Sequence, residues 1–201
     1  MQLVLATNNT DKIREIKHLL DDLPITIMTR DDFLDFPDPD ETGFTLTDNA
    51  RLKARAISEF TGLPALADDS GLEVDALAGA PSVYSSRFAG EGCTYEDNNR
   101  KLLDMMKSIP DERRTARFRC VICIWWGDRD HDVVEGTAEG FITRDLGGKE
   151  GFGYDPVFHY PPSGTRFSEM TLEQKNSVSH RGKALTLARD KIIERLNRPQ
   201  S

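Results

Sequence analysis

Residues 67–90 read ADDSGLEVDALAGAPSVYSSRFAG, and this stretch begins where an apolar run, Leu63 to Ala67, meets two adjacent carboxylates. The run predicts a strand in the interior of a sheet. Asp68 and Asp69 then present acidic oxygens where the strand reaches the surface, in an expected turn before a short strand at 72–74. A loop of small residues at 76–86 follows, and such a loop could border a ligand pocket. Together these features predict a site for a hard metal ion.

The rest of the chain alternates between predicted strands and predicted helices. A hairpin of two strands, a feature of antiparallel sheets, occurs beside strands that helices separate, so the sheet should be mixed. The pattern indicates an α/β fold with a long mixed β-sheet and helices packed around it. Thr47 is the expected N-cap of the second helix. Strands are expected at 2–6, 25–29, 115–126 and 132–142, and helices at about 11–20, 48–60, 95–109 and 179–196.

Composition limits the kind of protein and its partners. The net charge of -8 over 201 residues argues against binding to nucleic-acid polymers, which requires a basic surface. The chain contains no apolar run approaching the roughly 20 residues of a membrane helix, and Met1 leads directly into a strand. We therefore expect a cytoplasmic protein without a membrane partner. Three cysteines make no disulfide framework, and an expected strand would send Cys120 and Cys123 to opposite faces, so we expect both in the core, with metal or redox use as the alternative.

Two lysines and one acid that precede the carboxylate pair along the chain are further candidates for a ligand site. Asn9 and Lys12 lie where the first helix begins, and the N–H groups of that helical turn can cradle a phosphate. The alternative is that Asn9 or Thr10 only caps the helix and that Lys12 is solvated. Lys53, on the second helix, is either a surface charge or a phosphate contact. Glu41 precedes a polar turn and could project toward a ligand.

Two further segments follow the carboxylate pair. Residues 146–158 read LGGKEGFGYDPVF, in which Phe152 and Tyr154 could present ring faces to a planar base. The alternative is that these aromatic residues belong to the core. His180 and Arg181 fall in the first turn of the last helix, where positive charge opposes the helix dipole. An anionic or carbonyl-bearing partner would explain them, and a solvated basic pair is the alternative.

If these segments converge, they form a nucleoside-triphosphate hydrolase site. Carboxylates of Glu41, Asp68 and Asp69 would bind Mg²⁺, and one of them could take the proton of the attacking water. Phe152 and Tyr154 would hold the base. The chain contains no G-x-x-x-x-G-K-[ST] motif, so the site is not a P-loop. Lys12, Lys53 and Lys175 would neutralise a polyphosphate, and Arg181 would donate to an acceptor on the base edge.

The motifs also resemble a known family, the non-canonical purine NTP pyrophosphatases, also called inosine or xanthosine triphosphate pyrophosphatases. The resemblance runs from residue 1 to about 196. Asn8 departs from the family pattern, which often has glycine there, and Leu46 and Asp48 stand where bacterial members usually have Phe and Glu. The motifs are TNNTDK, ETGFTLTDNARLKA, ADDSGLEVDALAGAPSVYSSRFAG, FGYDP and KNSVSHRGKAL, in this order.

The resemblance implies a fold and an activity. It implies a single two-lobed domain over residues 1–196, with a central active-site cleft between the lobes, and we expect residues 197–201 to be a flexible C-terminal tail. It also implies a homodimer and an activity that depends on Mg²⁺. The expected reaction is hydrolysis of ITP, dITP or XTP to the monophosphate and pyrophosphate, which removes deaminated purines from the nucleotide pool.

The resemblance also assigns residues. Asp69 is the expected proton acceptor, and Glu41 and Asp69 are the expected metal ligands, with Asp68 as a further candidate. A non-catalytic purine-nucleotide-binding regulatory module stays open as an alternative, and a phosphatase for sugar phosphates is a third hypothesis. The expected substrate contacts are Thr7, Asn8, Asn9, Thr10, Asp11, Lys12, Lys53, Ser70, Phe152, Gly153, Tyr154, Asp155, Lys175, His180 and Arg181.

Overall fold

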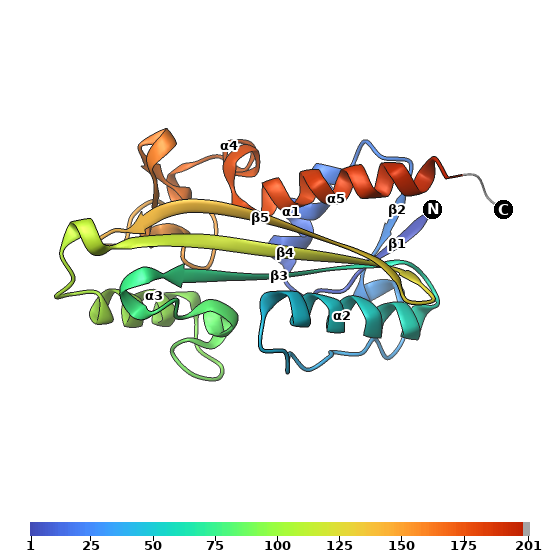
Figure 1. Ribbon diagram of the computed structural model, residues 1–201, viewed down its shortest axis with the longest axis horizontal. Coiled ribbons are helices and arrows are strands. Elements are labelled where there is room, and N and C mark those ends of the chain that lie inside the picture. Colours follow the sequence, from blue (N-terminus) through green and yellow to red (C-terminus); the bar gives the residue numbers. More distant parts are fainter. Residues whose placement is uncertain (199–201) are drawn as a thin grey trace. The chain divides into compact units, whose positions relative to one another are not determined.

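The computed structural model describes residues 1–198 and contains a mixed sheet with helices around it (Figure 1). Its strands are β1 (Gln2–Leu5), β2 (Thr26–Met28), β3 (Ala65–Val74), β4 (Thr115–Gly127), β5 (Asp130–Ile142), β6 (Phe158–Tyr160) and β7 (Thr165–Arg166). They form one seven-stranded sheet in the order β2-β1-β3-β4-β5-β6-β7. β1 pairs in parallel with β2 and β3, whereas β6 pairs antiparallel with β5 and β7. The predicted α/β fold with a long mixed sheet is therefore confirmed.

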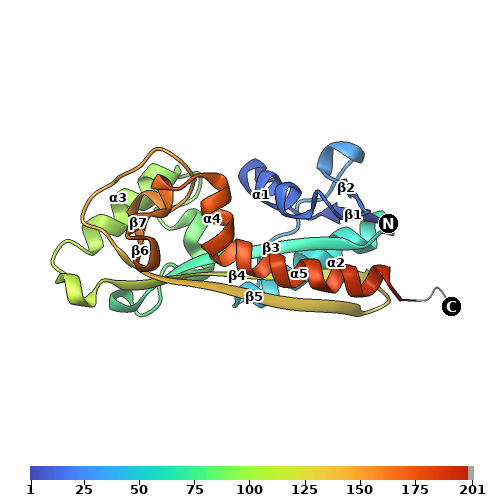
Figure 2. The same cartoon turned by 90° about the horizontal axis from the view of Figure 1, so that it is seen from above.

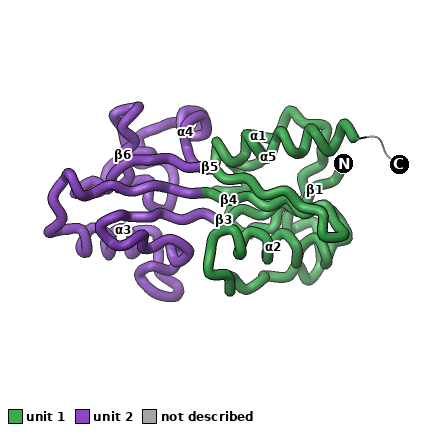
Figure 3. The backbone as a smooth tube through the Cα atoms, in the orientation of Figure 1, with its two compact units in different colours: residues 1–69, 120–136, 181–201 green, residues 70–119, 137–180 purple. Residues whose placement is uncertain are grey.

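The chain divides into two compact units, drawn in different colours in Figure 3. Unit 1 contains residues 1–69 and 120–136 and the chain from residue 181 onward, and unit 2 contains residues 70–119 and 137–180. The three long strands, β3, β4 and β5, each contribute one part to each unit. The helices are α1 (Thr10–Leu20), α2 (Leu46–Thr61), α3 (Tyr95–Met105), α4 (Leu172–Val178) and α5 (His180–Leu196).

The core of unit 1 forms because helices with one apolar stripe cover both faces of its strands. Figure 1 shows α1 and α5 on one face and α2 on the other, and Figure 2 shows α5 running alongside β4 and β5. On the first face, Leu66 of β3 packs with Ile16 of α1 and Leu185 of α5. α2 buries Ala50, Ala54 and Ile57, which recur at helical spacing.

The core of unit 2 is rich in aromatic side chains. Phe118 of β4 lies 4.7 Å from Phe158 of β6, measured between ring centroids, and 5.8 Å from Phe167. Leu102 and Met106, near the end of α3, are fully buried in the same cluster. Leu103 and Ile109 are partly buried against the same cluster.

Three sequence-based expectations about element boundaries are wrong. β3 runs from Ala65 to Val74 without the predicted turn at the carboxylate pair. Thr45, not Thr47, caps α2, since its hydroxyl accepts a hydrogen bond from the Asp48 main-chain nitrogen at 3.1 Å. Asp48 is the third residue after Thr45, and its Oδ2 in turn accepts from the Thr45 hydroxyl at 2.7 Å, a reciprocal contact that favours Thr45 as the cap. α3 ends at Met105, four residues before the expected end.

Other expectations agree with the structure. Cys120 and Cys123 are fully buried, and burial raises the pKa of Cys123 to about 12, so both cysteines belong to the core as predicted. No helix within residues 1–198 is long and apolar enough to cross a membrane. In the predicted tail, the main-chain nitrogen of Asn197 donates to Ile193 at 3.1 Å, whereas residues 199–201 lie outside the described residues.

Candidate active site

Asp68 and Asp69 lie in the middle of β3, and their side chains point to opposite faces of the sheet because successive side chains alternate along a strand. Asp68 shares its face with Leu66, which packs against α1 and α5. Asp69 points to the other face, which we call the α2 face, and contacts Asn49 and Lys53 there. The two adjacent acids therefore have different neighbours.

On the α2 face, the ammonium group of Lys53 joins three oxygen atoms. Lys53 Nζ donates to Glu41 Oε1 at 2.7 Å, to the Asp68 main-chain oxygen at 2.9 Å and to Asp69 Oδ1 at 3.2 Å. An ammonium group has three N–H donors, and these contacts use all of them. Lys53 is 8% exposed, so its interpretation as a surface charge is wrong. A phosphate that binds Lys53 would have to share or replace one of these acceptors.

Asn49 holds the second oxygen of Asp69. Its Nδ2 donates to Asp69 Oδ2 at 3.2 Å, and its Oδ1 accepts from the Gly43 main-chain nitrogen at 2.8 Å. Asn49 and Lys53 are four residues apart on α2 and therefore lie on one face of that helix. As a result, α2 supplies one donor to each oxygen of the Asp69 carboxylate.

The surroundings of Asp69 make its carboxylate more basic than that of an aspartate in water. Burial raises the pKa of Asp69 above its ordinary value, and the nearby Glu41 charge adds to this, although Lys53 and Lys12 act in the opposite direction. A carboxylate with a raised pKa takes a proton from water more readily near neutral pH. Asp69 is therefore suited to the predicted role of proton acceptor.

On the opposite face, Asp68 is fully buried among charged side chains. Its Oδ2 lies 3.0 Å from Lys12 Nζ and accepts from Arg181 Nε at 3.2 Å, while Arg181 Nη1 also donates to Glu15 Oε2. Burial by itself would raise the pKa of Asp68, but the charges of Lys12, Arg181 and Lys53 outweigh it and hold that pKa well below its ordinary value. Asp68 is therefore ionised near neutral pH and anchors two cations.

The segment from Thr7 to Lys12 forms the start of α1. Asn9 Oδ1 accepts from the main-chain nitrogens of Asp11 at 3.0 Å and Lys12 at 3.2 Å, so Asn9 is the N-cap. Asn9 therefore caps the helix as the alternative expected, two N–H groups of the predicted phosphate cradle already have a partner, and the phosphate contact stays a prediction. Lys12 is not solvated as that alternative expected, because it pairs with Asp68. The Asn9 main-chain nitrogen donates to Thr7 Oγ1 at 3.2 Å.

Four other predicted substrate contacts, three in unit 1 and Ser70 at the start of unit 2, differ in solvent exposure. Asn8 and Thr10 are exposed, and Asn8 Nδ2 donates to Asp38 Oδ1 at 3.1 Å. Asp11 and Ser70 are half-buried, in the first turn of α1 and in β3 respectively. All four stay predicted substrate contacts.

In unit 2, Phe152, Asp155 and Lys175 form a second cluster. Lys175 Nζ lies 2.6 Å from Asp155 Oδ2 and 4.6 Å from the centroid of the Phe152 ring. The Phe152 main-chain nitrogen donates to Asp155 Oδ2 at 2.9 Å, and the next residue, Gly153, accepts from Asn99 Nδ2 at 2.8 Å. Lys175 is therefore paired with a carboxylate, as Lys12 and Lys53 are, and it stays a predicted substrate contact.

Two other predicted residues of unit 2 pack inside it. Tyr154 is 4% exposed, its hydroxyl donates to the Ser85 main-chain oxygen at 2.9 Å, and burial raises its pKa. The His180 ring stacks on Phe118 with 4.5 Å between centroids and 8° between planes. The core alternative is therefore confirmed for Tyr154, and Phe152 is the half-buried aromatic residue of that loop. Arg181 is 3% exposed, so its interpretation as part of a solvated pair is wrong.

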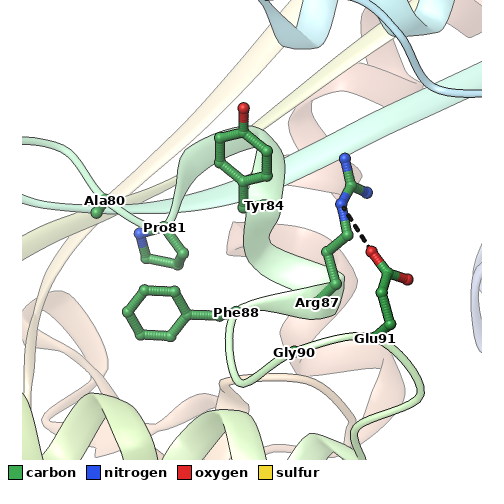
Figure 4. A pocket seen from close by; sticks show the side chains of 7 residues that line it. All are labelled: Ala80, Pro81, Tyr84, Arg87, Phe88, Gly90 and Glu91. Atoms are coloured by element: carbon green, nitrogen blue, oxygen red, sulfur yellow. Dashed lines mark ion pairs between the residues drawn. The ribbon is translucent and has the colours of Figure 1, made fainter.

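The loop after β3 borders a pocket of about 440 Å³, shown in Figure 4. The view shows apolar rings of Pro81 and Phe88 on one side and Arg87 directed toward Glu91, with 3.8 Å between the charged groups. Residues of the predicted loop therefore line a pocket, but Asp68 and Asp69 do not, and ligand binding beside this loop stays a prediction. Its lining consists of Ala80, Pro81, Tyr84, Arg87, Phe88, Gly90 and Glu91.

The oxygen atoms around Lys53 suit a hard divalent cation. Glu41 and Asp69 supply carboxylate oxygens, Asp68 supplies a carbonyl oxygen, and an ammonium group lies among them as the positive charge. Within the described residues, no group of three His, Cys, Asp or Glu side chains is arranged to hold a metal ion. Two carboxylates still fit Mg²⁺, which proteins usually bind through one or two carboxylates with water and substrate phosphates.

The sequence patterns do not single out two residues of these clusters. Glu15 is 2% exposed and pairs with Arg181, and Asn49 is fully buried against Asp69. Glu15 lies three residues after Lys12, and Asn49 lies four residues before Lys53. Helical spacing from a predicted site lysine is the signal that could have found both.

Comparisons with known proteins point to one family. The model of the Ham1 family matches residues 3–191. A dITP/XTP pyrophosphatase of Desulforamulus reducens is 51% identical over 198 residues, which are 98% of this chain and 96% of that protein. A dITP/XTP pyrophosphatase of Escherichia coli is 46% identical over 95% of this chain and 98% of its own length. A solved HAM1 protein from Coxiella burnetii has a TM-score of 0.89 and 41% identity over 96% of this chain and 99% of that chain.

Proposed function

Because the chain belongs to the Ham1 family, we propose that it hydrolyses dITP, ITP and XTP to the nucleoside monophosphate and pyrophosphate. Such an enzyme removes deaminated purine nucleotides from the precursor pool. The observation that carries the proposal is the cluster of Asp69, Glu41 and Lys53 on the α2 face, where a carboxylate with a raised pKa lies beside a cation. The names of the bacterial relatives support the same activity.

Asp69 is the proposed proton acceptor. A water molecule attacks the α-phosphorus, its proton passes to the Asp69 carboxylate, and the bond from the α-phosphorus to the oxygen that bridges to the β-phosphate breaks. Pyrophosphate then leaves with that oxygen. Asn49 and Lys53 each occupy one lone pair of Asp69, and each carboxylate oxygen has a second lone pair that can take the proton.

We propose that the activity depends on Mg²⁺ held by Glu41 and Asp69, with the main-chain oxygen of Asp68 as a further candidate ligand. When bound, Mg²⁺ supplies Lewis acidity that polarises a phosphoryl group and helps to ionise the attacking water. Lys12 and Lys53 lie beside the same acids and contribute positive charge for the triphosphate.

The base contacts are assigned to Phe152, Asp155 and Lys175. Hypoxanthine and xanthine carry a 6-oxo acceptor where adenine carries an amino donor. An N–H donor that Lys175 or Arg181 directs at the 6-oxo group would face the amino donor of adenine instead, and a hydrogen bond lost in this way costs about 1 to 3 kcal/mol. This difference accounts for discrimination against ATP, whereas discrimination against GTP has to arise at position 2 of the base.

The cytoplasm is the proposed location, and a homodimer is the proposed assembly. Small purine nucleoside triphosphates are the proposed partners, because a net charge of -8 disfavours nucleic-acid polymers. Sedimentation at several protein concentrations would test the homodimer.

A panel of substrates tests the proposed activity. We expect pyrophosphate from dITP, ITP and XTP with Mg²⁺, slower release from ATP and GTP, and none after chelation with EDTA. Equal rates for all five nucleotides would contradict the specificity, and orthophosphate as the direct product would contradict the bond assignment. Binding without any product would favour the regulatory-module hypothesis, and turnover of sugar phosphates alone would favour a general phosphatase.

A further inference from the structure

We propose that Asn49 is a positioning residue that fixes the Asp69 carboxylate and the turn after Glu41 relative to each other. This inference rests on the proposed function, because it assumes that Asp69 takes the proton of the attacking water. Asn49 is fully buried, whereas a residue that binds substrate directly has to reach the solvent-accessible part of the site. Asn49 therefore acts through Asp69.

Both polar atoms of the Asn49 amide are used. Nδ2 donates to Asp69 Oδ2 at 3.2 Å, and Oδ1 accepts from the Gly43 main-chain nitrogen at 2.8 Å. Gly43 lies two residues after Glu41, whose carboxylate accepts from Lys53 at 2.7 Å. One side chain on α2 thus connects the proposed base with the turn that carries the proposed metal ligand.

The connection depends on close approach of the main chain at Gly43. A Cβ atom at this position would lie 2.6 Å from Asn49 Oδ1 and 2.6 Å from Asp48 Cβ, closer than real Cβ contacts. A residue with a side chain would push the turn away from α2 and lengthen the hydrogen bond. The hydrogen bond between the Gly43 main chain and Asn49 therefore requires glycine at position 43.

Asn49 differs from Lys53, the other residue that holds Asp69. The Lys53 ammonium is charged, and a triphosphate would attract it away from Asp69 Oδ1, whereas the neutral Asn49 amide has no such competing partner. Asn49 is therefore the donor that keeps the orientation of Asp69 while a substrate is bound. A buried residue that only orients the base should influence kcat more than KM.

Two substitutions at position 49 test this inference. Asn49→Ala removes both hydrogen bonds. Asn49→Asp keeps an acceptor for the Gly43 nitrogen but replaces the donor to Asp69 with a second carboxylate. We expect both variants to lower kcat for dITP by roughly 10- to 100-fold, the usual loss for a residue that supports a site residue, with KM changed less than threefold. Ser58→Ala, at another buried polar position of α2, is the matched control and should keep the wild-type kcat.

Thermal unfolding of all variants accompanies the kinetics, so that each rate refers to folded protein. If both Asn49 variants keep the wild-type kcat, the inference is wrong. If Asn49→Ala loses activity but Asn49→Asp keeps it, Asn49 only anchors the turn, which also overturns the inference. Absence of pyrophosphate release by the wild-type protein would overturn the proposed function and this inference with it, whereas wild-type turnover with unaffected variants would overturn the inference alone.

Discussion

Separate replacement of the two adjacent acids of β3 should affect two different properties of the protein, stability in one case and activity in the other. Asp68→Asn should destabilise the protein, and Asp69→Asn should abolish most of its activity without that loss of stability. Asparagine preserves the shape of aspartate in both cases, so the two variants differ only in where a negative charge is removed. The contrast follows from the pKa of Asp68, which lies below its ordinary value, and that of Asp69, which lies above it.

The size of the first effect follows from the contacts of Asp68. Its carboxylate is fully buried, 3.0 Å from Lys12 and 3.2 Å from Arg181. Removing one partner of a buried ion pair usually costs about 3 to 5 kcal/mol. We expect the lower end, because Arg181 keeps Glu15 and the Lys12 side chain is 15% exposed. A loss of about 3 kcal/mol would lower the melting temperature by roughly 6 to 12 °C in a chain of this length.

For Asp69→Asn, the free energy of unfolding should change by less than about 1 kcal/mol, because burial already disfavours the charge that is removed. Loss of a general base should lower kcat by about 100- to 10,000-fold. Urea unfolding at pH 7 and pyrophosphate release from dITP measure the two quantities. Equal destabilisation of both variants would refute the separation of the two acids, and wild-type turnover by Asp69→Asn would refute the base assignment.

Three other predictions concern single features. The stability that Asp68 contributes should be constant above its unfolded pKa and lost as pH falls toward its lower folded pKa, so the stability difference between wild type and Asp68→Asn should shrink below about pH 4 in urea titrations. Thr45→Ala should lower the free energy of unfolding by about 1 kcal/mol, whereas Thr47→Ala should change it by less than half as much, and a larger effect at Thr47 would contradict the observed cap. Phe152→Ala should raise KM for dITP by about tenfold if the base stacks on this ring, and an unchanged KM would place the base elsewhere.

The sequence predicts the fold well because most of its strands and helices show clear hydrophobic periodicity. The turn expected at Asp68 is the main error. Acids followed by serine and glycine are typical of turns, but here cations neutralise the acids inside the sheet, and the strand continues. Those cations come from Lys12, Lys53 and Arg181, which are distant in sequence, so no local pattern could reveal the compensation.

The site residues are only partly predictable for a similar reason. Phe152 and Tyr154 are two residues apart in the same motif, yet one is half-buried beside Lys175 and the other is 4% exposed in the core. Composition and spacing do not distinguish these outcomes, because an aromatic ring suits both a core and a base-binding surface. Asn49 is difficult to predict because its importance arises from partners at Gly43 and Asp69.

The uninterrupted course of β3 accounts for the different roles that its two acids can take. A turn would let Asp68 and Asp69 face the same ligand, with similar neighbours and similar pKa values. In a strand, alternation sends Asp68 toward Lys12 and Arg181, which keep it ionised, and sends Asp69 toward α2, where burial makes ionisation less favourable. Neighbouring carboxylates whose pKa values are driven apart are a recurring basis for acid–base chemistry. The strand that fills the core of the sheet is therefore also what separates a structural anchor from a candidate catalytic base.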